Sequence, residues 1–70
     1  MITVNTTALI QVNEDETIKA NAKIVLDKIN YWYEIENICF VVMMNNDILQ
    51  LDVDMETFQN LIKLEEELLK

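Results

Sequence analysis

Apolar and polar side chains alternate along the first dozen residues of the chain. The apolar positions of one parity are Ile2, Val4, Ala8, Ile10 and Val12. Successive side chains of a strand point to opposite faces, so this alternation is typical of a strand with one buried face. The threonines in the segment add the β-branching that strands favour. The pattern predicts a β-strand over residues 2–12.

The next segment resembles a helix start followed by a helical face. Asn13 is a favourable N-cap, and Glu16 follows it at the spacing of a capping box. Apolar residues then recur at intervals of three and four, at Ile18, Ala22, Val25, Ile29 and Trp32. We therefore expect a helix over about residues 14–33. A strand is the rival interpretation, because a second apolar set alternates. This set is Ile18, Ala20, Ala22, Ile24 and Leu26.

Two segments rich in apolar residues, 38–44 and 48–53, stand on either side of Asn45-Asn46-Asp47. Asparagine and aspartate tolerate the positive φ that tight hairpin turns need, so the segments predict a β-hairpin. A two-residue loop gives one wholly apolar face, which we expect to face the core. That face carries Phe40, Val42, Met44, Leu49, Leu51 and Val53. The opposite face then carries Cys39, Val41, Met43, Ile48, Gln50 and Asp52.

Asp54 and the residues after it predict a second helix. Asp54 is a favourable N-cap for a helix over about residues 55–69, and Glu56 complements the dipole in its first turn. The apolar stripe of this helix is Phe58, Leu61, Ile62, Leu64, Leu68 and Leu69. The resulting order, β-α-β-β-α, indicates an α+β fold in which an antiparallel sheet with a central hairpin packs against two helices. The length fits one compact domain, residues 1–70.

The residue types that are missing remove most enzyme chemistry. The chain contains no Gly, Pro, Ser, His or Arg. Without Ser and His the usual hydrolase triads cannot form, and without Gly no phosphate-binding loop of the P-loop type can form. The acidic run from Asp52 fails as a calcium loop, because its sixth and twelfth positions are Thr57 and Lys63. We therefore expect no enzymatic activity, no cofactor and no metal site.

Cys39 is the only cysteine, and it lies in an apolar run. A lone cysteine forms no internal disulfide, which is typical of a reducing, intracellular setting. An apolar environment raises a thiol pKa, so we predict a buried structural residue rather than a nucleophile. The longest apolar run has seven residues, against about 20 for a membrane span, and the N-terminus has no signal-peptide pattern. The sequence therefore predicts a soluble, cytoplasmic protein.

The charge of the chain is strongly negative and unevenly distributed. There are 13 acidic residues and 5 lysines, a formal net charge of −8, and residues 29–62 hold six carboxylates and no basic side chain. A field of one sign repels nucleic acid and anionic membranes and attracts basic surfaces. We expect no direct binding to nucleic acid or membrane. The expected partner is a basic protein, and nucleic-acid-binding proteins are one such class.

The most concentrated aromatic segment is Tyr31-Trp32-Tyr33. Trp32 continues the apolar face of the predicted helix, so one tyrosine is left near the surface beside Glu34 and Glu36. Tyrosine is over-represented among interface hot spots, although an ordinary helix end explains the segment equally well. The candidate partner-binding residues are Tyr31, Tyr33, Glu34, Glu36, Asp47, Asp52 and Glu56.

Two hypotheses follow for the function. The first is a non-enzymatic interaction protein, an inhibitor or adaptor, that docks acidic and aromatic side chains on a basic partner. In size, acidity and lack of chemistry the chain is similar to small phage-encoded inhibitors of host defence or repair enzymes, some of which mimic DNA. In its DNA-mimic form, this hypothesis requires carboxylates spaced like phosphates. The predicted fold gives three of them, Glu34, Glu36 and Asp52, no structural task.

The alternative hypothesis is a small homo-oligomeric structural or assembly subunit, such as a homodimer. Its acidity would then serve solubility alone. A domain of this size buries only about 60% of the surface of its unfolded chain, so oligomerisation would add stability.

Overall fold

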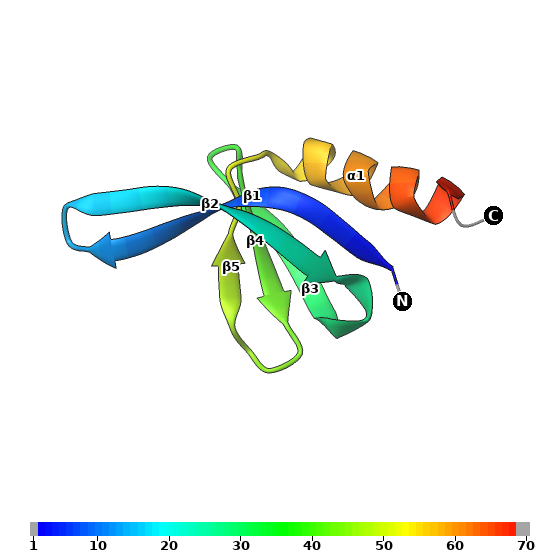
Figure 1. Cartoon of the computed structure of the whole chain (residues 1–70), viewed down its shortest axis with the longest axis horizontal. Helices are drawn as coiled ribbons and strands as arrows, with labels where there is room; N and C mark the ends of the chain where they lie inside the picture. The colour runs from blue at the N-terminus through cyan, green and yellow to red at the C-terminus, as the bar shows by residue number, and fades with distance from the viewer. Residues whose placement is uncertain (1, 69–70) are drawn as a thin grey trace.

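Five β-strands and one α-helix make up residues 2–68, the part of the chain that the computed structural model describes (Figure 1). The elements are β1 (Thr3–Asn13), β2 (Glu16–Val25), the 3-10 helix η1 (Leu26–Lys28), β3 (Ile29–Ile35), β4 (Ile38–Met43), β5 (Ile48–Gln50) and α1 (Met55–Leu68). These elements fit the α+β class. The predicted order, β-α-β-β-α with two helices, is wrong, because all the described strands precede a single α-helix.

The segment predicted as the first helix, residues 14–33, is instead a turn, the strand β2 of a long hairpin, η1 and most of β3. β2 pairs antiparallel with β1 in a register that places Ile18 opposite Ile10. The rival strand interpretation of the sequence is therefore the correct one. Asn13 bonds within the turn, where its side-chain oxygen accepts from the N–H of Asp15 at 3.0 Å. Asparagine serves a turn as well as a helix cap, so this local signal does not separate the two structures.

A second hairpin joins β3 to β4 through the two-residue turn Glu36-Asn37. Glu36 and Asn37 have φ of 50° and 66°, the left-handed values of a type I′ turn. The turn brings Ile35 opposite Ile38, and a bulge at Asn30 shifts the register near the other end of β3. The turn therefore determines which side chains of β3 share a face with those of β4.

The predicted hairpin of β4 and β5 is confirmed, but its loop has three residues, Met44, Asn45 and Asn46. The N–H of Met43 donates to the carbonyl of Asp47 at 2.8 Å. Asn46 has φ of 72°, and its N–H donates to the carbonyl of Met43 at 2.9 Å. A left-handed residue at the end of a three-residue loop is a common hairpin connection, and asparagine supplies it in a chain without glycine.

The extra loop residue reverses the predicted faces of β4. Val41 lies opposite Leu49, so the two share the face that points to the core. Cys39 and Val41 are fully buried, whereas Met44, predicted in the core with Phe40, is 59% exposed. A shift of one residue in pairing moves every side chain of a strand to the other face, which is why the predicted core face is wrong for β4. Its other half is confirmed, because Leu51 is fully buried and Leu49 and Val53 pack against the core.

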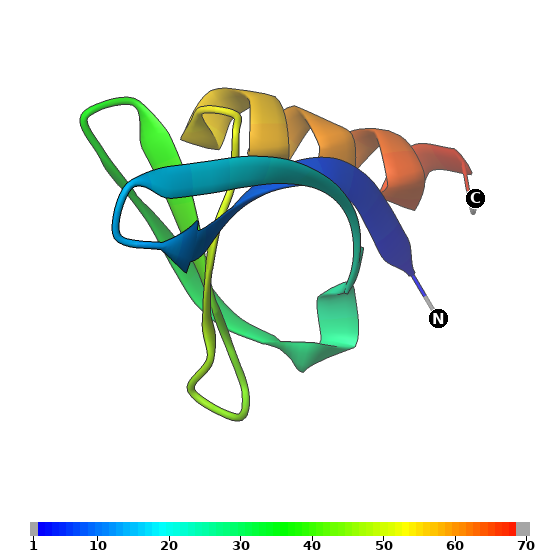
Figure 2. The same cartoon turned by 60° about the vertical axis from the view of Figure 1, so that its left-hand side comes forward.

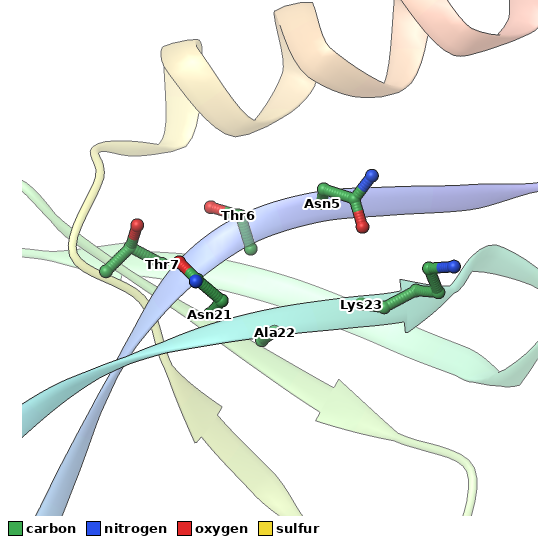
Figure 3. Close-up of a pocket in the computed structure, with 6 residues that line it drawn as sticks. All are labelled: Asn5, Thr6, Thr7, Asn21, Ala22 and Lys23. Atoms are coloured by element: carbon green, nitrogen blue, oxygen red, sulfur yellow. The ribbon is translucent and has the colours of Figure 1, made fainter.

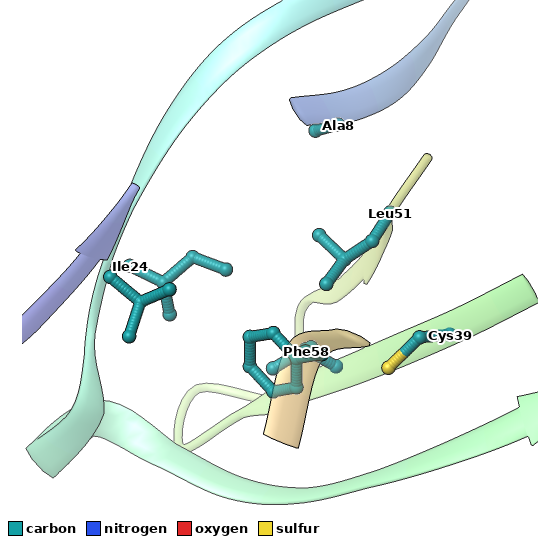
Figure 4. Close-up of a cluster of buried hydrophobic side chains, with 7 residues drawn as sticks. Ala8, Ile24, Cys39, Leu51 and Phe58 are labelled. Atoms are coloured by element: carbon teal, nitrogen blue, oxygen red, sulfur yellow. The ribbon is translucent and has the colours of Figure 1, made fainter. Parts of the chain in front are cut away.

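The two sheets, β1-β2 and β3-β4-β5, meet where Ala8 bridges to Leu51 just after β5. Beside the bridge, the N–H of Asp52 donates to the carbonyl of Thr7 at 2.8 Å. Figure 2 shows the strands curling round a common interior. The buried cluster in this interior is Val4, Ala8, Ile24, Cys39, Val41, Leu51 and Phe58 (Figure 4). The predicted burial of Cys39 is confirmed.

α1 covers this interior. Asp54 caps the helix as predicted, because its Oδ1 accepts from the N–H of Thr57 at 2.8 Å. Phe58 is fully buried and meets Trp32 edge-on, with ring centroids 5.5 Å apart. Leu69, predicted to continue the apolar stripe, lies outside the described residues. In the described part of the chain, no helix has the length and apolar character to cross a membrane.

Candidate functional site

The face of the β3-β4-β5 sheet that points away from the core is mostly apolar. Its side chains alternate with buried ones of the same strands, such as Cys39 and Val41. Three of them are strongly exposed, Tyr31 at 52%, Ile35 at 55% and Ile48 at 61%. We call this surface the outer sheet face. It consists of Tyr31, Tyr33, Ile35, Ile38, Phe40, Val42, Ile48 and Gln50, of which Val42, between Tyr31 and Ile48, is buried.

A row of aromatic rings lies along the outer sheet face. Tyr33 of β3 stacks on Phe40 of β4, with ring centroids 5.3 Å apart and planes 16° apart. Tyr31 continues the row, 6.2 Å from Tyr33. A helix would point the two tyrosines in different directions, whereas residues i and i+2 of a strand share a face. The structure thus brings these two predicted site residues together.

Carboxylates stand at both ends of the outer sheet face. Glu36 follows Ile35 in the β3–β4 turn, and Asp47 precedes Ile48 after the β4–β5 loop; the six residues of β4 separate the two turns. The N–H of Asp47 donates to Asn45 Oδ1 at 3.0 Å, and Asn45 Nδ2 donates to Asp47 Oδ2 at 2.9 Å. Glu36 and Asp47, both predicted site residues, therefore lie on opposite rims of one apolar surface.

Glu34 and Glu56, two further predicted site residues, lie at the start of α1 instead. Glu34 Oε2 accepts from the N–H of Met55 at 2.9 Å, and Glu56 belongs to the first helical turn. The first N–H groups of a helix have no partner within it, and the positive end of the helix dipole favours carboxylates. The prediction that Glu34 has no structural task is therefore wrong.

Asp52 belongs to neither group. Its Oδ2 lies 3.0 Å from the Nζ of Lys19 on β2, the one ion pair within residues 2–68. The Lys19 side chain is 70% exposed and that of Asp52 35%, so solvent screens the pair. Pairs this exposed contribute about 0–1 kcal/mol. Asp52 thus links the end of β5 to β2, and the expectation that it has no structural task is wrong as well.

Two titratable groups with shifted pKa values lie near the start of α1. Burial raises the pKa of the Cys39 thiol, and the nearby charges of Glu34 and Asp54 raise it further. Hydrogen bonding with the Thr57 side chain, and then with the Thr57 N–H, lowers the pKa of Asp54. At neutral pH Cys39 is therefore a protonated thiol and Asp54 a carboxylate. Among the residues described, no three His, Cys, Asp or Glu side chains are placed to hold a metal ion.

An open groove of about 470 Å³ lies along the β1-β2 hairpin (Figure 3). Its lining residues are Asn5, Thr6, Thr7, Asn21, Ala22 and Lys23. Figure 3 shows these side chains spread along two strands rather than converging on one point. The groove offers amide, hydroxyl and ammonium groups for polar contacts.

Comparison of the chain with protein-family models, with curated proteins and with solved structures gives no match. The residues and their geometry therefore carry the functional argument alone. Both tyrosines were predictable from the sequence, but the apolar residues beside them were missed. These are Ile35, Ile38, Phe40 and Ile48. The alternation of Tyr31, Tyr33 and Ile35 was the available signal, and the helix prediction concealed it.

Proposed function

We propose that this protein is a non-enzymatic interaction module that docks its outer sheet face on a basic partner protein, as an inhibitor or adaptor in the cytosol. The observation that supports the proposal best is an exposed aromatic and aliphatic surface with a carboxylate at each end. Such a surface fits a partner that carries an apolar patch between basic side chains. The packing of α1 on the opposite side of the sheet leaves this face free for a partner.

The exposed apolar area supports a docking role. Soluble monomers rarely expose contiguous apolar patches larger than a few hundred Å² unless the patch binds something. Tyr31, Ile35 and Ile48 are each more than half exposed, and they lie on β3 and β5, on either side of β4. The stacking of Tyr33 on Phe40 holds the aromatic row in place. Rigid aromatic side chains lose little conformational entropy on binding, so they are efficient contacts.

The backbone conformation of Glu36 supports a role for its carboxylate in binding. Its φ of 50° is left-handed, a conformation that costs an L-residue about 1–2 kcal/mol. Glycine, asparagine or aspartate would fit this turn position better. Strained residues cluster at binding sites, where the interaction outweighs the strain. Glu36 is therefore the first candidate for contact with a basic side chain of the partner.

The net charge of −8 would act mainly on association rate and partner choice. Complementary fields bring partners together faster, and salt screens this attraction beyond a Debye length of about 10 Å at 0.1 M. The apolar centre of the outer sheet face favours a mixed apolar and basic protein surface as the target. DNA mimicry is the narrower form of the proposal, in which that target also binds nucleic acid.

The test is capture of a partner from lysate of the cell that makes the protein, followed by binding measurements on that partner at low and high salt. Tyr31→Ala with Ile48→Ala removes one strongly exposed anchor from each outer strand of the sheet, and we expect binding at least tenfold weaker. Glu36→Gln with Asp47→Asn is expected to slow association and to flatten its salt dependence. Leu64→Ala, at a position 53% exposed on α1, is the matched control and should bind as the wild type does.

Binding that survives the Tyr31→Ala and Ile48→Ala changes undiminished would place the contact elsewhere and reject the proposal. Saturating DNA distinguishes the two forms. If DNA displaces the protein from its partner, the DNA-mimic form is supported, and if binding is unchanged that form fails while the wider proposal stands.

A further inference from the structure

The β1-β2 hairpin reaches well beyond the rest of the molecule. Its last backbone pairing with the rest of the molecule is the bridge between Ala8 and Leu51. Lys19 reaches back to Asp52 through its ion pair, and every residue from 10 to 19 is exposed. The molecule is accordingly elongated, with principal extents of 44 × 23 × 20 Å. Figure 1 shows the hairpin projecting from the body on the side away from the chain termini. We call residues 9–19 the arm.

One face of the arm is apolar. It continues the face of β1 that is buried in the core at Val4 and Ala8. Beyond the core this face carries Ile10 and Ile18, which are 43% and 44% exposed. Val12, 49% exposed, follows where the register between β1 and β2 shifts. Ile10 lies directly opposite Ile18, so the exposed side chains are neighbours. The arm thus presents a core-like surface to solvent.

The exposed area of the whole chain exceeds that of a compact monomer. The chain exposes 5157 Å², and its mass is 8.2 kDa. A compact monomer of that mass exposes about 4,500 Å². The excess of about 600 Å² matches what each partner contributes to a small specific interface. An interface along the arm would therefore reduce the exposed area of each chain to about that of a compact monomer of its mass.

Charge indicates which surface can meet a second copy. Two chains of −8 repel each other, so self-association is least opposed where charge is absent. β1 carries no charged side chain along its 11 residues. The free edge of β2, in contrast, carries Lys19 and Lys23, and charged residues on an edge discourage strand pairing. Contact between two copies is thus easiest along β1.

We propose that the arm pairs with the arm of a second copy of this chain, edge to edge along β1, to form a homodimer. The edge is available beyond Ala8, because β1 pairs with no other strand on that side. The carbonyl of Thr7 accepts from Asp52 on the side away from β2. Backbone groups of alternate residues point the same way in an antiparallel ladder, so those of Leu9 and Gln11 also point away from β2. This contact is independent of the outer sheet face.

A two-fold axis at Gln11 makes the contact self-complementary. It brings Ile10 of each copy close to Val12 of the other, so the exposed apolar residues of the two arms cover one another. An isologous contact of this kind closes at two copies. The lysines on β2 then lie on the two outer edges of the combined sheet, where they oppose further pairing.

Sedimentation equilibrium of the full chain at micromolar concentration tests the proposal, with circular dichroism as the check on folding. We expect the wild type to be a dimer. Gln11→Pro removes an N–H that points at the second copy and leaves the ladder with β2 intact. We therefore expect a dimer dissociation constant at least tenfold higher. Thr17→Pro is the matched control. Thr17 lies opposite Gln11, so this substitution removes an outward N–H from the other edge of the hairpin. It should remain as dimeric as the wild type.

A second variant, Ile10→Asp, tests the apolar contact and is expected to be monomeric and folded, since Ile10 is exposed in the monomer. Raising the salt from about 0.05 M to about 0.5 M should strengthen the dimer, because it screens the repulsion between like-charged chains. The complex with a basic partner should weaken under the same change, so the two associations are distinguishable. A wild type that stays monomeric at its highest soluble concentration, or a Gln11→Pro dimer as tight as the wild type, overturns the proposal.

Discussion

At the scale of single residues, two carboxylates hold the first turn of α1 from different directions. Asp54 bonds the N–H of Thr57 from within the helix start, and Glu34 bonds the N–H of Met55 from β3. Together they satisfy two of the N–H groups that a helix leaves without internal partners. Glu34 also ties the helix to the sheet, so the position of α1 depends on a contact between distant parts of the chain.

The lowered pKa of Asp54 predicts how its cap depends on pH. A carboxyl whose folded pKa is depressed contributes stability above its unfolded pKa, ordinarily 3.8, and loses it as pH falls through the lower folded value. Asp54→Ala should therefore lower the Tm at pH 7 by about 5 °C, since it removes the cap. Thermal unfolding followed by circular dichroism between neutral and strongly acidic pH measures this.

Asp54→Asn separates the charge from the cap. Asparagine also caps helices well, so this variant should stay close to the wild type at pH 7. Any advantage of the wild type over Asp54→Asn should disappear as the pH falls below 3.8 and Asp54 becomes protonated. An advantage that persists or grows at acidic pH would show that the charge of Asp54 is not what stabilises the cap.

At the scale of elements, turn residues determine which segments pair, and in which register, more than strand or helix propensity does. The cap at Asp54 could be predicted, because all the groups it uses lie within one helical turn. The segment 14–33 could not, because Asn13 suits both a cap and a turn, and the choice rests on pairing with β1. Likewise, Asn46 signals a turn but does not state how many residues the loop contains.

The turn Glu36-Asn37 provides a prediction at this scale. Replacing it with Asn-Gly, the pair that type I′ turns prefer, relieves the left-handed strain at Glu36. The double variant Glu36→Asn, Asn37→Gly should be more stable by about 1 kcal/mol, a rise in Tm of about 4–8 °C. Urea and thermal unfolding measure the change.

Glu36→Gln is the control for charge, since it keeps the backbone strain and removes the carboxylate. It should show no gain in Tm, yet it should slow association with the partner as much as the double variant does. If the Asn-Gly turn destabilises the protein, the strain assigned to Glu36 is absent.

At the scale of the whole molecule, the two tyrosines and the rim acids Glu36 and Asp47 could be singled out from composition and charge alone. Their grouping could not, because it depends on the registers of two hairpins. Glu34 and Asp52 acquired structural partners for the same reason: each bonds a residue far away in the sequence. The apolar centre of the outer sheet face was missed because its strand β3 was predicted as a helix end.

The charge balance predicts an unusual response of stability to salt. Within the described residues a single exposed ion pair, Lys19–Asp52, opposes the repulsion among the carboxylates of a chain with a net charge of −8. Screening should therefore remove more repulsion than attraction. We expect the Tm to rise by roughly 5 °C between low salt and about 0.5 M NaCl.

The Tm should be measured at low protein concentration, so that self-association contributes little to it. Sucrose at matched osmolality is the control for general solvent effects. A Tm that falls with NaCl would mean that ion pairs, rather than apolar packing, hold the fold together.

Because of the three-residue loop between β4 and β5, the fold is more sensitive to a deletion in this loop than to a substitution. A substitution at Met44 changes one exposed side chain, and one at Asn45 also removes its hydrogen bonds to Asp47, but neither changes the number of residues in the loop. Deleting a single codon there would turn β5 over relative to β4, bringing Ile48 inward and Leu49 outward. A single in-frame deletion in this loop would therefore exchange the buried and exposed faces of β5. It would also change the surface that the protein presents to a partner.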